Sequence, residues 1–186
     1  AQYVAFNNNG VSFVDPFGLI DWEGEQAGRL RDQLKATKHG ASKIIELESA
    51  EKSSGHTIKV TTSATGTDEY NGQAYTINIS GKERKYRSGD ELITADPREI
   101  INHELDHAFF HLNKGSGEYA RARVQIPGDP MFSVIERHAI EDTNLLSAEL
   151  GRKPRTKYTD EPGTWIRGVK WPTKTHANFG GYNADK

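Results

Sequence analysis

The stretch that decides the fold is Asp96–Gly115, DPREIINHELDHAFFHLNKG. It opens with a strong helix start signal. Asp96 can cap the helix, Pro97 fits its first turn, and Glu99 can close a capping box with the aspartate. A glycine at 115 is typical of the position after a helix end. The stretch therefore predicts a helix that starts at Asp96, runs to about Asn113 and stops before Gly115.

This predicted helix has two different faces. At about 100° per residue, His103 and His107 lie on one face, one turn apart, and Glu104 lies at the edge of that face. An apolar stripe falls on the opposite side and is made by Ile101, Leu105, Ala108 and Leu112. The pattern predicts a helix that buries one face and presents a polar working face.

The polar face carries His103-Glu104-x-x-His107, the pattern of zinc peptidases. In such sites zinc lowers the pKa of a bound water towards about 7 and polarises the scissile carbonyl, and the glutamate moves the proton to the leaving amine. His111 continues the series, but three turns of a straight helix are too long for three rings to share one ion. We therefore expect Zn²⁺ bound by His103 and His107, with Glu104 as the catalytic base. His111 is expected to be a neighbour of the site or a solvated residue, and not a ligand.

A third protein ligand has to come from another element, and the next predicted helix, Ser133 to Leu150 with Gly151 as its terminator, is the natural source. Its candidates are Glu136, His138, Glu141 and Asp142. A carboxylate would leave the fourth zinc position open for water. Ser133-x-x-Glu136 can equally be a capping box, and spacing alone does not separate Glu136 from Glu141.

The composition indicates one folded domain of ordinary size. Of 186 residues 34% are hydrophobic and 27% charged. A net charge of −2 and a pI of about 6.4 provide no attraction to nucleic acid. Cysteine is absent, so a metal must be held by His, Asp or Glu. No run approaches the ~20 apolar residues that span a bilayer.

The remaining sequence predicts a mixed architecture. Residues 21–53 are rich in helix formers with a break at His39-Gly40, whereas 57–61 and 75–79 alternate as strands do and 92–94 is a short third strand. Residues 82–90 are expected to form a charged turn, and most of 152–186 an ordered loop. The fold class expected is α+β, a small zincin-like domain with a short mixed or antiparallel sheet packed on the zinc helix. Strand 75–79 is expected to be an interior strand; the alternative is an edge strand that pairs with a peptide.

Several blocks resemble the NleD-like effector zinc metallopeptidases over about residues 96–158. They are His103 to Ala108, Glu136-x-x-Ala139-Ile140 with Asn144, Leu150-Gly151, and Pro154-Arg155-Thr156-x-Tyr158. The resemblance implies Glu136 as the third ligand. The sequence departs from the family at Thr143, where a second Glu would stand; if that Glu is the family's ligand, Glu141 becomes the substitute. The resemblance also suggests Tyr158 as a transition-state stabiliser and Arg155 as a residue that holds this turn.

The first nineteen residues resemble the end of the shell domain of Rhs proteins, through Tyr3 to Phe13 and the Asp15-Pro-x-Gly-Leu19 segment. That family encloses a variable C-terminal toxin and cuts it free after this segment. The resemblance implies a cut between Leu19 and Ile20, with residues 20–186 as the toxin. It also implies an Rhs shell and a cognate immunity protein as partners. The start of the sequence lacks signal-peptide regions, so export is expected to rely on a carrier.

These residues leave three possible functions. The first is a zinc endopeptidase toxin that acts on a protein of the target cell after delivery by a contact-dependent or phage-tail-like (type VI) secretion machine. The second is a nuclease of the His-Asn-His kind, suggested by Asn102 and Asn113 near the histidines. The third is an inactive module that keeps a structural zinc, although neither zinc binding nor folding would require Glu104.

Overall fold

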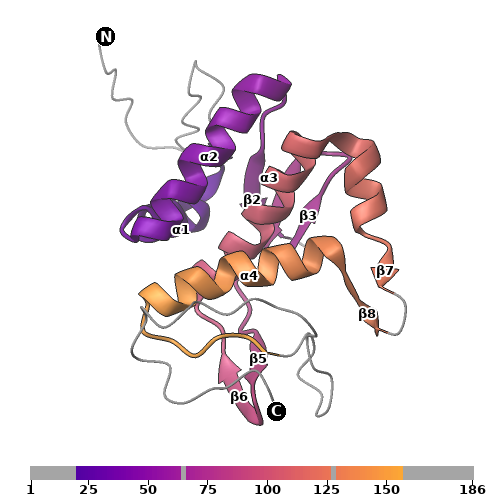
Figure 1. Cartoon of the computed structure of the whole chain (residues 1–186). Helices are drawn as coiled ribbons and strands as arrows, with labels where there is room; N and C mark the ends of the chain where they lie inside the picture. Colours follow the sequence, from indigo (N-terminus) through magenta and orange to yellow (C-terminus); the bar gives the residue numbers. More distant parts are fainter. Residues whose placement is uncertain (1–19, 64–65, 127–128, 157–186) are drawn as a thin grey trace.

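The computed structural model describes residues 20–63, 66–126 and 129–156, and these form a mixed α+β structure with four helices and a small sheet (Figure 1). The elements in chain order are β1 (Asp21–Trp22), α1 (Gly24–Lys35), α2 (Lys38–Ser54), β2 (Lys59–Thr62), β3 (Glu69–Asn71), β4 (Thr76–Ile79), β5 (Lys85–Ser88), β6 (Glu91–Thr94), α3 (Pro97–Ala122), β7 (Gln125–Ile126), β8 (Asp129–Ser133) and α4 (Val134–Glu149). None of the helices in these ranges is long and apolar enough to cross a membrane.

The main sheet has the strand order β1-β2-β4-β3, and it is mixed. The strands β1, β2 and β4 run parallel, while β3 pairs antiparallel with β4, so that Tyr70 lies opposite Ile77. Strand β4 is therefore interior, as expected, and the alternative that it is a peptide-pairing edge strand is wrong. One edge of this sheet is β3, which contacts α3; the sequence did not predict this strand, because three residues are too few to establish an alternating pattern.

Helix α3 is the central element. It packs most extensively against α4 and α2, and it also contacts β3 and β4. Figure 1 shows α2 and α4 on different sides of α3. The predicted apolar stripe is buried as expected, with Ile101, Leu105 and Ala108 fully buried and Leu112 partly buried against the same core.

The predicted start of α3 is confirmed. The Asp96 side chain accepts a hydrogen bond from the Arg98 amide at 2.9 Å, and Glu99 accepts one from the Asp96 amide at 2.8 Å. The predicted stop is only half correct. Gly115 leaves helical geometry with φ 78° and ψ 163°, but helical structure resumes after it and continues to Ala122. Glycine adopts this positive φ without steric cost, so the chain can bend here.

The break between α1 and α2 lies at Ala36-Thr37, before the predicted His39-Gly40. The Thr37 side chain caps α2 by accepting from the Gly40 amide at 3.0 Å. Gly40 marks close packing, because a Cβ there would lie 2.5 Å from Leu34 atoms. Helix α4 begins after its Ser133 cap and ends before Gly151, which has the expected left-handed φ of 67°.

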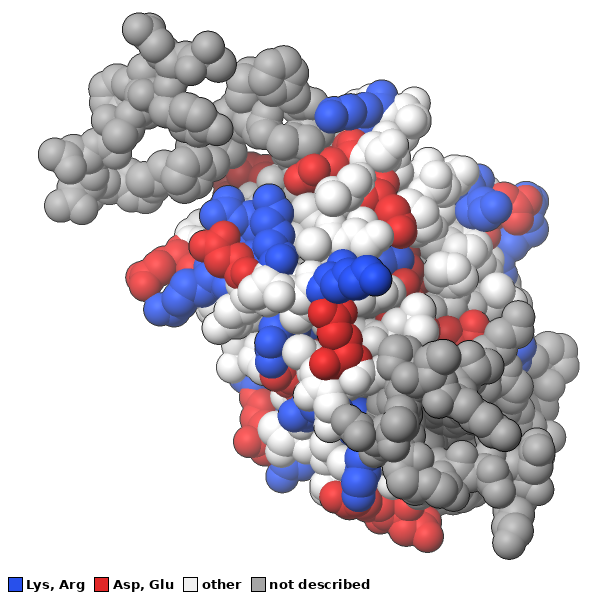
Figure 2. All heavy atoms as spheres, turned by 60° about the vertical axis from the view of Figure 1, so that its left-hand side comes forward, with Lys and Arg blue, Asp and Glu red and all other residues white. Residues whose placement is uncertain are grey.

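The predicted charged turn at 82–90 contains strand β5, which pairs with β6 in a separate hairpin. The segment after α4 is tied to this hairpin. Tyr86 donates its hydroxyl proton to the Lys153 carbonyl at 2.8 Å, and the Thr156 amide donates to the Arg87 carbonyl at 2.9 Å. On the side of the molecule that carries α1 and α2, acidic and basic side chains are interspersed without a continuous patch of one sign (Figure 2).

Three predictions fall on residues outside the described ranges. These are the cut after Leu19, the transition-state role of Tyr158, and the loop beyond residue 156. Ile20, on the other side of the predicted cut, is described, and its side chain is buried in the core. All three stay predictions.

Candidate metal centre

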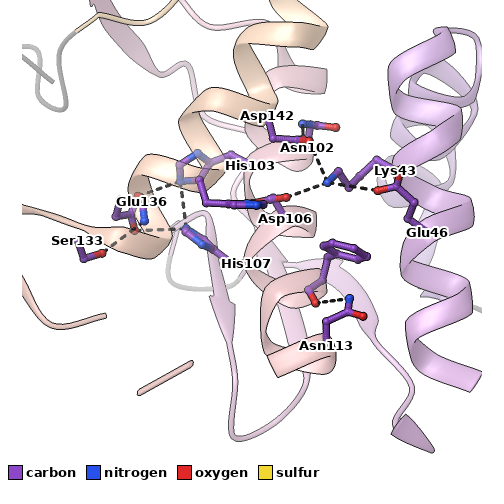
Figure 3. A network of polar contacts seen from close by, with 12 residues as sticks. Lys43, Glu46, Asn102, His103, Asp106, His107, Asn113, Ser133, Glu136 and Asp142 are labelled. Carbon is purple, nitrogen blue, oxygen red and sulfur yellow. Dashed lines mark hydrogen bonds and ion pairs between the residues drawn. The ribbon is translucent and has the colours of Figure 1, made fainter. Parts of the chain in front are cut away.

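The side chains of His103, His107 and Glu136 converge on one point (Figure 3). The Nε2 atoms of His103 and His107 lie 3.1 Å apart. The Glu136 carboxylate lies 3.1 Å from His103 Nε2 and 3.3 Å from His107 Nε2. One ligand atom from each residue can be chosen so that all lie within 4.8 Å of one another, and in the described part of the chain this is the only such group of three. The group could hold a metal ion.

The two helices that supply these ligands explain their placement. His103 and His107 are one turn apart on α3, as the sequence predicted, and Glu136 lies in the first turn of α4. The Ser133 hydroxyl accepts from the Glu136 amide at 3.4 Å, which is the serine half of the predicted capping box. The Glu136 carboxylate is nevertheless directed at the histidines. Capping and ligation are thus compatible here, because the cap uses the Glu136 amide and leaves its side chain free for the site.

The electrostatics of this group suit a cation. Burial raises the pKa of Glu136, but the hydrogen bonds and charges of the two histidines outweigh it, so the pKa lies well below its usual range. Burial lowers the pKa of His107, but Glu136 and the charge of Glu104 more than offset this, and the net pKa is raised. A proton or a metal ion would therefore be held at these imidazoles, and the two compete for the same atoms.

The donor set fits a metal ion in a second respect. Two imidazole nitrogens 3.1 Å apart with a carboxylate beside them are ligands that divalent metal ions accept, zinc among them, and the set is not specific to zinc. The outer Nδ1 atoms of both rings are buried and have no hydrogen-bond partner among the described residues. Packing and the carboxylate of Glu136 therefore orient these rings.

Glu104 lies beside the group, and a backbone amide of the main sheet binds its side chain. Its Oε2 accepts a hydrogen bond from the Tyr70 amide at 2.7 Å, and its residue is only 9% exposed. Tyr70 is the middle residue of the edge strand β3, and it lies opposite Ile77, a pairing in which its amide points away from β4. The unpredicted strand thus positions the residue that the sequence singled out as the base.

A cavity of about 380 Å³ opens over the centre. Glu104 and all three candidate ligands line it, together with Tyr70 of β3 and Tyr86 of β5. Tyr119, Arg123 and Arg155 also contribute to its wall. A carboxylate, a potential metal group and a cavity of small-ligand size therefore share one location.

The other candidates for the third ligand lie elsewhere. His138 Nδ1 is 2.5 Å from Asp106 Oδ2, and Asp142 pairs with Lys43, on a different flank of α3. Glu141 is not part of the group that could hold a metal. Among the described residues only Glu136 forms a group with the two histidines that could hold a metal, and its role as the third zinc ligand stays a prediction.

His111 is a neighbour of the site, as expected, and it is not solvated. It is 3% exposed; its Nδ1 lies 2.8 Å from the Tyr70 hydroxyl and its Nε2 lies 2.9 Å from Ser116 Oγ. Burial and the charge of His56 lower its pKa, so the ring stays neutral.

The asparagines that suggested a nuclease have other partners. Asn102 donates to Asp142 at 2.8 Å, and Asn113 donates to the Phe109 carbonyl at 2.9 Å (Figure 3). Neither lines the cavity. The nuclease hypothesis gains no support from these two residues.

Comparisons with protein families, with curated proteins and with solved structures give no match to this chain.

Proposed function

We propose that this chain is a zinc-dependent endopeptidase with a zincin-like fold. The observation that carries the proposal is the convergence of His103, His107 and Glu136 in a cavity that also contains Glu104. His103, His107 and Glu136 would hold the ion, which when bound supplies a Lewis acid that acidifies water and polarises a carbonyl.

The chain's own residues supply the proton transfer. Glu104 removes a proton from the attacking water as the water oxygen bonds to the scissile carbonyl carbon. The same carboxyl group then gives that proton to the departing amine as the C–N bond breaks, so the carboxylate is regenerated. The hydrogen bond from the Tyr70 amide fixes one Glu104 oxygen and thereby orients the carboxylate for both steps.

We further propose that the peptidase is the toxic tip of an Rhs-type carrier, cut free between Leu19 and Ile20 and acting on a protein of the target cell. The resemblance of residues 1–19 to an Rhs shell end supports this part of the proposal. Intact mass and N-terminal sequencing of the product made from the full parent protein test it. An N-terminus at Ile20 is expected, and a parent that remains uncut would contradict the release step.

The peptidase activity is tested with Glu104→Gln, which keeps the size of the side chain but cannot act as a base. We expect zinc content and melting temperature to stay at the wild-type values while cleavage falls by about 10²–10⁴-fold. New protein termini in cells that receive wild-type toxin, compared by mass spectrometry with cells that receive the variant, measure the loss. Glu118→Gln, an exposed change on the same helix, is the matched control.

Each result separates one of the alternatives. Undiminished toxicity of Glu104→Gln would overturn the peptidase mechanism. Degraded DNA or RNA without new protein termini would favour the nuclease. A wild-type protein that binds zinc at full stoichiometry but cleaves nothing would favour the inactive module.

A further inference from the structure

Tyr119 is a cavity residue that the sequence did not bring to notice. It lies in the helical segment that resumes after Gly115, and it lines the same cavity as His103, His107 and Glu104. The bend at Gly115 separates its part of the helix from the part that carries the histidines. Tyr119 is 7% exposed, so its ring is packed while part of it borders the cavity.

The Tyr119 ring is held on several sides. It stacks on His111 with ring centroids 4.4 Å apart and an interplanar angle of 27°, and it meets the edge of Tyr70 at 5.9 Å. A Cβ at position 72 would lie 3.0 Å from its Cε1 atom, so Gly72 makes room for it. The guanidinium of Arg123 lies over the ring, 5.7 Å from its centroid.

The partners of this ring are themselves fixed. Both nitrogens of His111 are occupied, one by the Tyr70 hydroxyl and one by Ser116 Oγ. Tyr70 in turn donates its amide proton to Glu104. One connected set of contacts therefore positions both the Tyr119 ring and the proposed base, which is the preorganisation that a catalytic site requires.

The hydroxyl of Tyr119 is the part of the ring that has no such partner. No described residue forms a hydrogen bond with it, whereas the Tyr70 hydroxyl is used by His111. Burial raises the pKa of Tyr119 to about 12, Arg123 lowers it, and the charges of Glu104 and Glu136 raise it again. The phenol is therefore protonated at neutral pH, and its electrostatic partners are the carboxylates of the metal centre.

We infer that Tyr119 is a catalytic residue whose hydroxyl donates a hydrogen bond to the scissile carbonyl oxygen of the bound peptide. This inference rests on the proposed peptidase function. The hydrogen bond strengthens as negative charge grows on that oxygen while water adds to the carbonyl carbon, and no proton leaves the tyrosine. The sequence pointed instead to Tyr158 for this role.

The test is Tyr119→Phe in the full 186-residue chain, because phenylalanine keeps the ring and its stacking and removes only the hydroxyl. The first probe is a tryptic peptide mixture, in which mass spectrometry identifies the peptide bond that the wild type cuts fastest. A quenched fluorescent peptide with that sequence then gives kcat and KM separately. We expect kcat to fall by about a hundredfold while KM changes by less than about threefold.

Two controls separate catalysis from structure. Tyr75→Phe removes a hydroxyl from the ring that stacks on His111 at 5.2 Å, and Tyr75 is outside the cavity lining. We expect wild-type kcat for this variant. Zinc content and melting temperature of Tyr119→Phe should equal those of the wild type, and a loss of either in proportion to the loss of kcat would overturn the catalytic assignment in favour of a structural one.

The outcomes also distinguish this inference from the proposed function. If Glu104→Gln is inactive and Tyr119→Phe keeps wild-type kcat, the peptidase stands and the assignment of Tyr119 is wrong. If Tyr158→Phe alone loses kcat, the hydroxyl belongs to Tyr158. If the wild type cuts no peptide that Glu104→Gln leaves intact, the peptidase function fails and the role of Tyr119 fails with it.

Discussion

Two flanks of α3 carry the same residue types in different states (Figure 3). On one flank, His103, His107 and Glu136 converge without a basic side chain of the described residues at their centre. On the other, Asp106 and Asp142 also converge, but the ammonium of Lys43 lies between them, 2.8 Å from Asp106 and 2.9 Å from Asp142.

In the cluster of Lys43, Asp106 and Asp142, called the Lys43 network below, the protein itself supplies the positive charge that balances the carboxylates. Lys43 is 3% exposed and Asp106 fully buried. Burial lowers the pKa of Lys43, but the two carboxylates outweigh it and the net pKa is raised, so the ammonium is charged at neutral pH. Asp142 also contacts His39 at 3.2 Å and Asn102 at 2.8 Å. Burial raises the pKa of Asp142, but the hydrogen bonds and charges of His39 and Lys43 outweigh it and the net pKa is lowered.

The difference shows how to distinguish a structural cluster from a binding site in this fold. Buried carboxylates and imidazoles on both flanks attract a cation, because an uncompensated buried charge is costly. Where the chain supplies the cation, as Lys43 does, the cluster joins helices. Where it supplies none, the cation must be a proton or an external ion. Each prediction below changes one charged residue of a buried cluster and states the loss or gain of metal affinity or stability that should follow.

The largest effect is expected at the flank without a protein cation. Glu136→Gln removes the negative charge of the proposed third ligand while it keeps the shape of the side chain. Loss of an outer partner of a metal ligand costs about 10–100-fold in affinity, so loss of a ligand should exceed this, and we expect roughly a thousandfold or more. Competition for zinc with a chromophoric chelator measures the affinity. Glu141→Gln is the matched control on the same helix, and if the control lost zinc instead, the ligand set would have to be reassigned.

A smaller effect is expected where the chain supplies its own cation. Lys43→Met leaves Asp106 and Asp142 without their ammonium, but each keeps another partner. Removal of one member of a buried ion pair costs about 3–5 kcal/mol, and the remaining partners place this change near the lower end, about 3 kcal/mol of unfolding free energy. Urea unfolding at pH 7 in the presence of chelator measures it.

Lys59→Met is the comparison for Lys43→Met, because Lys59 pairs with Glu23 at the surface. A surface ion pair contributes little to stability, so the urea unfolding curve of Lys59→Met should match that of the wild type. Equal curves for both lysine variants would show that the buried network does not depend on its ammonium, and the distinction between the two flanks would lose its basis.

The sequence predicted those features that depend on neighbours along the chain. The Asp96 cap, the two histidines one turn apart and the Gly151 terminator all follow from residues within one or two turns of each other. Even the bend at Gly115 was marked, although the helix beyond it was not. Glu136 was singled out only with help from a family resemblance, because spacing left Glu141 equally suitable.

The features that the sequence missed depend on contacts across the fold. Lys43 and Asp106 are 63 residues apart, and an isolated lysine in a helix gives no sign of burial. Strand β3 is too short for a pattern, yet its Tyr70 amide holds the carboxylate of Glu104. Tyr119 stands out because it is buried and follows the bend at Gly115. Neither its burial nor the bend is known before the fold is known.

Glu51 is a third kind of buried carboxylate, and its substitution should have the smallest effect on stability. It also tests the distinction between buried carboxylates that have a cation of the protein beside them and those that do not. Glu51 is 2% exposed, and no basic group of the described residues forms an ion pair with it. Its Oε1 accepts from the Ile58 amide at 2.5 Å, and its buried Oε2 has no hydrogen-bond partner in the part of the chain that the structure describes. Burial raises the pKa of Glu51 from 4.5 to about 7, against the opposing effect of the Ile58 hydrogen bond. Because the folded pKa lies above the unfolded one, the stability gained from the protonated group is present below about pH 4.5 and is lost as the pH rises through about 7.

Glu51→Gln, which stays neutral at every pH, should therefore match the wild type near pH 4.5 and be more stable at pH 8. A shift from 4.5 to about 7 corresponds to at most about 3 kcal/mol, and relaxation around the charge reduces the expected gain to about 2 kcal/mol. Urea unfolding at the two pH values measures the difference, with the exposed Glu25→Gln as the control that should show none. A gain of the same size at both pH values would mean that the pKa of Glu51 is the same in the folded and the unfolded protein, so that burial does not disfavour its ionised form. In that case the ionised carboxylate would be stabilised in the fold as well as it is in water, and Glu51 would belong with the compensated network of Lys43.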